Sequence, residues 1–416
     1  MKIFFTIILL SVQTLSLFAQ ENFNQIRYKF YGFVRGDAMF DTRQSVAGNE
    51  GLFFLYPKDK EEDVNGEDLN QVSNSGIYAF NARTGVDITG LNIRNAKLSA
   101  KIEADFAGFS GSYGASSTVL RIRHAYLKAD RKNSTLLFGQ TWHPMFTPVF
   151  PNVISLSTGA PFTPFNRSAQ IRYDYKIERV TLTGAAISQL QFLSYGPDGR
   201  SNIYQRNAVI PELFFGVNYT DSRISAGAGI DYLTLDPRTK SVVDTQTYKV
   251  DERISSLSYS AYCKYTKDLF SISAETVYGR NLAHLSMLGG YGIKSIDPTT
   301  GKQEYTNFTH SSSWLNISYG KKYMGNFFAG YTKNLGSKDA LVEKTPVYGE
   351  GLSLNDLYRF CGTFSYNISK FSAGLEYELT TADYGNADSF NRNKGKYDST
   401  HAVTNHRILG VIYYYF

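Results

Sequence analysis

The sequence predicts an all-β fold, a transmembrane antiparallel β-barrel of about sixteen strands with short periplasmic turns and long extracellular loops. Three observations lead to this fold class. Polar and apolar residues alternate along many segments, short and long connections follow each other in turn, and the chain ends on an alternating aromatic strand, RILGVIYYYF. The composition agrees, because 31 Tyr and 29 Phe accompany a mean hydropathy of only −0.28.

The first residues, MKIFFTIILLSVQTLSLFAQ, have the form of a secretory signal peptide. One basic residue, Lys2, precedes an apolar stretch too short to span a bilayer, and a candidate cleavage site follows Ala19. The alternative is a frayed first strand or a membrane anchor. We expect residues 1–19 to be a signal peptide and residues 20–416 to form a single outer-membrane β-barrel domain.

Residues 97–106, KLSAKIEADF, show the alternation without a break. A soluble sandwich would cover the apolar face with a second sheet, whereas a barrel covers it with lipid and keeps water inside. Closing the barrel also pairs every backbone group, which lipid requires. The residues expected to face lipid are Leu98, Ala100, Ile102, Ala104 and Phe106.

Sixteen segments of this kind run along the chain, and seven short connections alternate with long ones, as in an even-stranded barrel wide enough for an aqueous channel. The predicted strands are 27–40, 76–88, 93–106, 117–129, 134–142, 168–175, 178–187, 210–219, 223–235, 252–266, 269–280, 310–320, 324–333, 356–367, 370–381 and 403–416.

The same alternation predicts which side chains line the pore. The expected pore-lining residues are Arg35, Asp37, Arg83, Lys97, Lys101, Arg121, Arg123 and Arg172. It places Tyr78, Phe80 and Tyr126 on the lipid side, and His124 as well, although a strand bulge is the expected reason for a histidine there.

The first six strands therefore form a wall rich in Arg and Lys, while later strands carry Glu275, Glu376 and Glu378. In one interpretation these charges pair along the wall and only keep it wet. In the other, the basic wall faces an acidic one and the field across the pore attracts and orients anionic solutes.

One connection differs from the rest. Residues 141–168, TWHPMFTPVFPNVISLSTGAPFTPFNRS, contain five of the chain's 11 prolines. So apolar a loop is costly in water, which favours a constriction loop folded into the barrel over a surface loop or a subunit contact. The residues expected to form the constriction are Pro148, Phe150, Pro151, Phe162 and Phe165.

Three motifs, YGFVRGDAMFDTR, LRIRHAYLKAD and FGQTWHPM, resemble the DcaP-like porins and, more distantly, the phosphate-selective porins of Gram-negative bacteria. The resemblance implies a sixteen-stranded homotrimeric channel for small, often anionic solutes such as dicarboxylates. It carries a pore role onto Arg35, Arg83, Arg121 and Arg123. The chain lacks the lysine ladder expected of a phosphate-selective channel.

The sequence gives little support for an enzyme. Six His match no zinc spacing, GFSGSYG is neither a nucleophile elbow nor a P-loop, and the acidic run KDKEEDVNGEDLN only faintly resembles a calcium loop. We expect no catalytic residue, no metal and no cofactor. The basic residues form no stripe for nucleic acid.

The expected function is an outer-membrane porin for passive diffusion of small hydrophilic solutes, with a preference for anions such as dicarboxylates. The alternative is a binding or uptake-complex barrel that does not conduct on its own. The expected partners are anionic or neutral solutes, outer-membrane lipid and lipopolysaccharide, two further copies of the chain, and the barrel-assembly machinery through Phe416.

Overall fold

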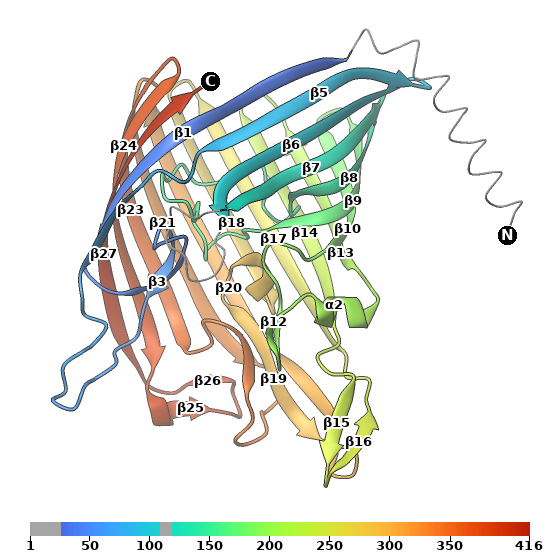
Figure 1. The fold of residues 1–416 in the computed structure, drawn as a ribbon, viewed down its shortest axis with the longest axis vertical. Coiled ribbons are helices and arrows are strands. Elements are labelled where there is room, and N and C mark those ends of the chain that lie inside the picture. Colours follow the sequence, from blue (N-terminus) through green and yellow to red (C-terminus); the bar gives the residue numbers. More distant parts are fainter. Residues whose placement is uncertain (1–25, 109–118) are drawn as a thin grey trace, which may run out of the picture.

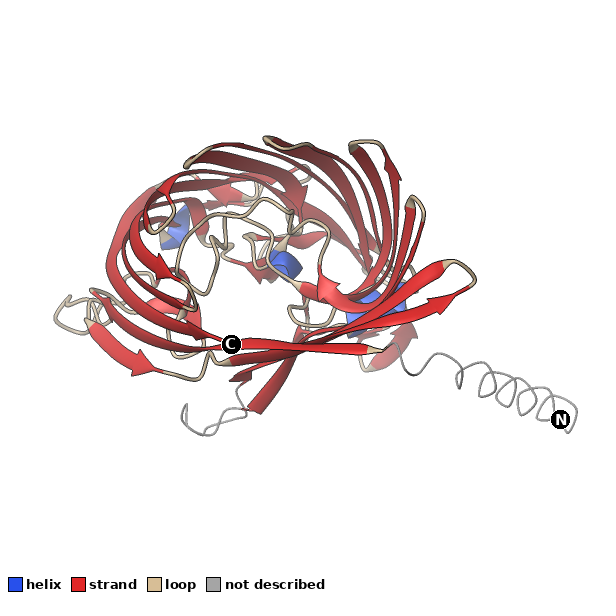
Figure 2. Cartoon of the chain, turned by 90° about the horizontal axis from the view of Figure 1, so that it is seen from above, coloured by secondary structure: helices blue, strands red, loops and turns tan. Residues whose placement is uncertain are grey.

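The computed structural model describes residues 26–108 and 119–416 and shows a closed antiparallel barrel (Figures 1 and 2). The predicted signal peptide and most of GFSGSYG lie outside the described residues. The ring closes where β1 (Arg27–Asp41) pairs with β27 (Thr400–Tyr415), in a register running from Phe33↔Tyr415 to Asp41↔Arg407. The predicted fold class is confirmed.

The barrel wall has sixteen strands, as predicted, because β4 and β5 act as one broken strand and two further strands of the sheet, β19 (Gly289–Ile296) and β22 (Val347–Glu350), lie in long connections. The strands are β1, β4 (Asn74–Tyr78) with β5 (Arg83–Ile93), β6 (Ala96–Gly108), β7 (Val119–Arg131), β8 (Ser134–Trp142), β9 (Arg167–Ile177), β10 (Val180–Ser188), β13 (Glu212–Thr220), β14 (Ile224–Leu235), β17 (Ile254–Lys267), β18 (Phe270–Arg280), β20 (Gln303–Gly320), β21 (Tyr323–Ser337), β23 (Leu354–Ile368), β24 (Phe371–Gly385) and β27.

The connections alternate in length as expected. The turns at 94–95, 132–133 and 369–370 are two residues long and lie at the same end of the barrel as the C-terminus (Figure 1). The long connections carry the remaining elements: β2 (Ser45–Gly48), β3 (Phe53–Pro57), β11 (Tyr195–Gly196), β12 (Gly199–Arg200), α2 (Ile203–Ala208), β15 (Lys240–Val243), β16 (Gln246–Lys249), η3 (Ala283–Leu285), β19 (Gly289–Ile296), β22 (Val347–Glu350), η4 (Ala387–Ser389), β25 (Phe390–Asn391) and β26 (Lys396–Tyr397).

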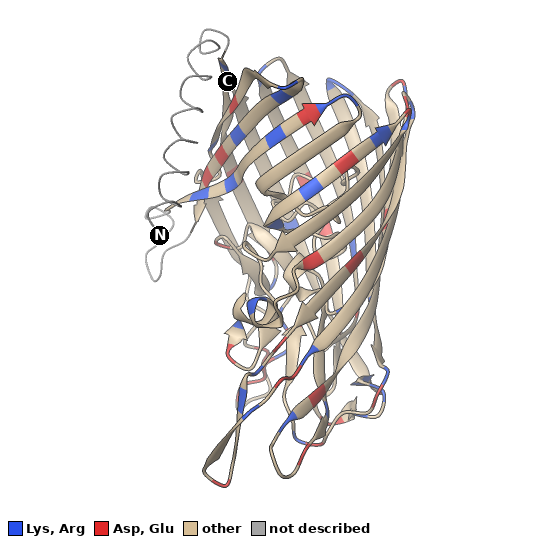
Figure 3. Ribbon diagram, turned by 90° about the vertical axis from the view of Figure 1, so that its right-hand side faces the viewer, with Lys and Arg blue, Asp and Glu red and all other residues tan. Residues whose placement is uncertain are grey.

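Alternation along the strands sorts side chains between the two faces. On β1, Phe30 is 73% exposed on the outer face, while Arg35 and Asp37 are buried on the inner face. Charged residues of both signs recur along the strands at the upper end and in the long loops at the lower end (Figure 3). Among the described residues, no helix is long and apolar enough to cross a membrane.

The prediction for Tyr78 and Phe80 is wrong, because the strand breaks between β4 and β5. Tyr78 pairs with Asp37 and Arg83 pairs with Phe33, so both an even and an odd position face inward. Four residues that are not extended separate them and reverse the alternation. Phe80 is buried among apolar side chains on the inner side, close to Met39.

The prediction for Tyr126 is also wrong, for a related reason. In β7, Ile122 pairs with Ala104 and His124 pairs with Glu103, so Arg123 is an extra residue in a β-bulge. The bulge turns His124 inward, as the sequence suggested, but it shifts every later residue of the strand too. Tyr126 therefore lies opposite Lys101, and Leu127 is the exposed residue on the outside.

Candidate functional site

The site is built around a loop that crosses the barrel interior. Residues 143–166, here called the inward loop, connect β8 to β9 and lie inside the ring (Figure 2). Ile154 accepts a hydrogen bond from Arg35 Nη2 on β1 (2.8 Å) and donates one to Glu376 Oε2 on β24 (2.9 Å). Farther along, Thr163 Oγ1 donates to Glu275 Oε2 on β18 (2.7 Å). The loop thus spans walls that are far apart in the sequence.

Apolar packing fixes the later half of the loop. Phe162 is fully buried and stands edge-on to Phe328, with ring centroids 6.1 Å apart. Phe165 is 5.0 Å from the ring centroid of Trp142. Pro151 is buried, whereas Pro148 and Phe150, on either side of the buried Val149, remain exposed. The predicted constriction residues therefore divide into a packed set and an exposed pair.

The acidic side chains of the later strands hold this loop. Glu376 accepts hydrogen bonds from the backbone of Ile154 and Ser155, and Glu275 accepts from Thr163 and Trp314. Glu378 forms an ion pair with Arg359 at 3.3 Å. All three carboxylates are buried. The acidic wall therefore lies beneath the loop and does not face open water across a pore.

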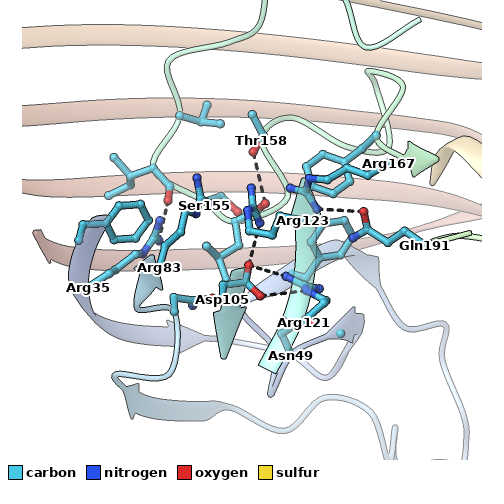
Figure 4. Close-up of a pocket in the computed structure, with 18 of the residues that line it drawn as sticks. Arg35, Asn49, Arg83, Asp105, Arg121, Arg123, Ser155, Thr158, Arg167 and Gln191 are labelled. Atoms are coloured by element: carbon cyan, nitrogen blue, oxygen red, sulfur yellow. Dashed lines mark hydrogen bonds and ion pairs between the residues drawn. The ribbon is translucent and has the colours of Figure 1, made fainter. Parts of the chain in front are cut away.

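The basic wall, by contrast, borders a cavity of about 340 Å³ (Figure 4). We call it the basic cavity. Its lining includes Ser155 and Thr158 of the inward loop. The arginines that line it are Arg35, Arg83, Arg121, Arg123 and Arg167, and the lining contains one carboxylate, Asp105.

Asp105 of β6 holds two of the arginines in place. Arg121 donates two hydrogen bonds to it, at 3.0 and 2.9 Å, and Arg123 Nη1 donates a third at 2.8 Å. Arg123 Nε also donates to Glu103 at 2.7 Å. Two guanidinium groups thus share two carboxylates, and Arg121 is the more exposed, with 29% of its side chain accessible. The arrangement keeps N–H groups close to the cavity.

The other predicted residues are distributed along the wall. Arg35 donates to Asp37 at 2.7 Å, and Arg83 lies 3.6 Å from Glu103 and over the ring of Phe33. Besides Asp37, three predicted positions do not line the basic cavity. Lys101 pairs with Asp87 at 3.1 Å, Arg172 with Asp174 at 2.9 Å beside a second cavity, and Lys97 is exposed near the turn at 94–95.

Arg167 is the residue that the strand pattern missed. It begins β9, is 2% exposed, and its guanidinium carbon lies 3.8 Å from the ring centroid of Trp142. Nη1 donates to Gln191 at 2.9 Å, and Nε has no hydrogen-bond partner. No carboxylate pairs with it in the part of the chain that the structure describes. The one signal in the sequence for Arg167 is its position beside the Pro- and Phe-rich segment.

The second cavity, of about 350 Å³, lies on another side of the inward loop. Phe150 and Pro148 face it together with Arg172 and Trp142, which also lines the basic cavity. The exposed pair of loop residues therefore borders space that is distinct from the arginine cluster. This places the two halves of the predicted constriction on different surfaces of the interior.

Comparison with known proteins agrees with this fold and with the motifs. Residues 16–187 match the family model described as DcaP outer membrane protein. The solved outer membrane channel DcaP of Acinetobacter baumannii is similar over 95% of this chain and 98% of its own, with a TM-score of 0.67 and 19% identity. The predicted resemblance to the DcaP family is confirmed. No curated protein matches the chain.

Two further solved porins share the fold. The anion-selective porin from Comamonas acidovorans is 10% identical with a TM-score of 0.53, over 94% of this chain and 100% of its own. OmpT of Vibrio cholerae in its trimer form is 12% identical with a TM-score of 0.54, over the same shares of the two chains. The chain is an outer-membrane barrel with the porin fold.

Proposed function

We propose that the barrel forms a water-filled channel for passive diffusion of small hydrophilic solutes and that it prefers anions such as dicarboxylates. One observation carries the proposal: the inward loop covers the acidic side chains of the wall, while five arginines border the basic cavity. A solute passing that cavity meets guanidinium N–H groups, which bind carboxylates with two parallel hydrogen bonds.

The charge balance of the basic cavity supports anion preference. Asp37, Glu103 and Asp105 partly neutralise the arginines, but Arg167 has no carboxylate partner among the described residues. The cavity therefore keeps a positive excess. At 0.1 M salt, screening acts over about 10 Å, so charges in a narrow lumen still act on a passing ion.

Three further parts of the proposal concern partners. The chain assembles as a homotrimer, by analogy with the trimer form of OmpT from Vibrio cholerae. Its exposed apolar outer face contacts lipid and, on the outer leaflet, lipopolysaccharide. Phe416, half exposed at the end of the last strand, serves as the recognition signal for the barrel-assembly machinery.

The test is a single-channel recording of the purified protein in a planar bilayer under a KCl gradient. We expect discrete conductance steps and a reversal potential on the anion side. The double variant Arg83→Gln with Arg121→Gln should move this potential toward cations, because each side chain is nearly a third exposed, and Arg123 remains to neutralise Glu103 and Asp105.

The matched control is Arg253→Gln, which removes a half-exposed arginine that pairs with Asp251 in an extracellular connection. It should leave the reversal potential unchanged. A cation-selective wild type would refute anion preference. A folded protein that never conducts would favour the alternative, a binding barrel that needs a partner.

A further inference from the structure

We propose that His143, Glu212 and His284 form a binding site for a divalent first-row transition ion, with zinc as the ion that fits best. Their ligand atoms all lie within 4.8 Å of one another. Two imidazoles and a carboxylate are a common ligand set for zinc. The sequence offers no zinc motif, because 141 positions separate the two histidines.

The donor atoms converge on one point. His143 Nε2 lies 3.0 Å from Glu212 Oε1, and His284 Nε2 lies 2.7 Å from the same oxygen. The two rings are nearly perpendicular, with centroids 6.3 Å apart. Asp231 Oδ1 lies 3.9 Å from His143 Nε2 and can complete a four-ligand set after a small movement.

The site joins the loops to the wall. Glu212 begins β13 and Asp231 lies in β14, whereas His143 is the first residue of the inward loop and His284 lies in η3. All four side chains are 2% exposed or less. Residues close to the two histidines in the sequence, Met145, Leu282, Leu285 and Met287, belong to one buried apolar cluster. Such a closed, dry setting is typical of structural metal sites.

The two buried carboxylates favour binding of a cation. No lysine or arginine of the described residues forms an ion pair with Glu212 or Asp231. Glu212 contacts both histidines, and Asp231 lies near His143 and beside Glu212. Glu212 Oε2 and Asp231 Oδ1 are buried without a hydrogen-bond partner. A buried carboxylate without compensation is costly, and a divalent ion would neutralise both and occupy the free oxygens.

The Nδ1 atoms of the two histidines determine whether each Nε2 is free to bind an ion. His284 Nδ1 has no hydrogen-bond partner, so it is free to carry the ring proton while Nε2 binds the ion. His143 Nδ1 accepts a hydrogen bond from Met145 N at 3.2 Å. While Nδ1 accepts this bond, the ring proton of His143 is on Nε2. If Nε2 binds the ion instead, the ring proton must lie on Nδ1, and the hydrogen bond from Met145 N is lost. In the competing arrangement both rings simply donate Nε2–H to Glu212.

An ion at this position would fasten the beginning of the inward loop, and η3 with it, to β13 and β14. The ion would then act as a structural clamp on the channel interior rather than as a catalyst. This role does not depend on which solute the channel carries.

The experiment uses the mature chain, refolded from denaturant into detergent with Zn²⁺ or Co²⁺ and freed of excess ion. We expect about one bound ion per chain and, with Co²⁺, the visible absorption of a four-coordinate nitrogen and oxygen site. Glu212→Gln keeps the size and an acceptor oxygen for the histidines, and it should lower ion binding at least tenfold. His284→Gln should do the same.

The control is His401→Gln, which changes a partly exposed histidine that pairs with Asp59 in the long loops. It should retain the full ion content. Folding of each protein is verified by its heat-dependent mobility shift on a gel. A folded wild type without stoichiometric ion, or a folded Glu212→Gln that keeps it, would overturn the proposal. The wild-type cobalt spectrum decides the matter even if a variant does not fold.

Discussion

Arg123 shows how one residue can link the wall's structure to its charge. Arg121 and Arg123 lie two residues apart and both face inward beside Asp105, and the β-bulge at Arg123 turns His124 inward as well. Arg123 is 6% exposed and also binds Glu103, so it compensates two buried carboxylates. Arg121 binds only Asp105 and reaches into the basic cavity. We therefore infer that Arg123 mainly stabilises the wall, while Arg121 mainly contacts solutes.

This difference predicts unequal costs of removal. Arg123→Gln leaves Glu103 and Asp105 short of a counter-ion in a buried setting, and we expect the free energy of unfolding to fall by about 3–5 kcal/mol. Arg121→Gln leaves Arg123 in place and should cost about 1 kcal/mol. Urea unfolding followed by the fluorescence of Trp142 and Trp314 measures both. Equal losses for the two variants would contradict the assignment of roles.

The inward loop shows how an element can decide which charges a solute meets. Its backbone N–H groups at Ile154 and Ser155 occupy Glu376, and its carbonyl at Ala160 accepts from Arg359. Prolines fix φ and remove backbone donors, which suits a segment that has no strand partner inside the barrel. The loop covers the carboxylates, whereas Arg83 and Arg121 of the basic wall remain partly exposed.

Deleting residues 152–158 tests the constriction role. The deletion is geometrically favourable, because the ring of Pro151 already packs close to Gly159. We expect single-channel conductance to rise, since the segment that crosses toward β1 and β24 is gone. Anion preference should fall as well, because Glu376 loses its two loop partners, Ile154 and Ser155, and becomes exposed to water.

A shortened loop elsewhere controls for a general loosening of the barrel. The hairpin β15–β16 extends outside the ring, and trimming residues 243–246 at its tip should leave conductance unchanged (Figure 1). If the 152–158 deletion leaves conductance unaltered, the inward loop does not form the narrow part of the pore.

At the scale of the whole molecule, the closed ring sets the orientation in the membrane. The rim with the short turns carries exposed aromatic side chains such as Tyr319, Tyr323 and Tyr414, which suit the interface between lipid and water. Barrels of this class direct short turns to the periplasm and long loops outward. The acidic run near Glu61 and the turn after Arg131 then lie on opposite sides of the membrane.

Epitope tags test this orientation. A tag inserted beside Glu61, an exposed position between β3 and β4, should bind antibody on intact cells. A tag after Arg131, in the two-residue turn between β7 and β8, should become reachable only after the outer membrane is permeabilised. Surface labelling at Arg131 on intact cells would contradict the proposed orientation in the membrane.

The sequence by itself determined the barrel. Period-2 alternation, the rhythm of short and long connections and the final strand predicted all sixteen strands, and β8 (Ser134–Trp142) to the residue. The largest differences are β20, which begins at Gln303 and not at 310, and the second strand, which is broken and runs on to Ile93. These signals are local, because lipid outside and water inside impose the same alternation on every strand. The predicted side-chain directions are wrong at Tyr78, Phe80 and Tyr126, because a strand break and a bulge reverse the alternation there. Neither irregularity can be recognised from the composition of the segment.

Only the tertiary structure decided what fills the interior. Alternation assigned Glu275 and Glu376 to the inner face. It could not predict that the inward loop would bind both of them. It also could not bring Arg167 onto Trp142, or His143 and His284 onto Glu212. These contacts join residues far apart in the chain, so they depend on the path of the long connections across the ring, and no repeating pattern encodes that path.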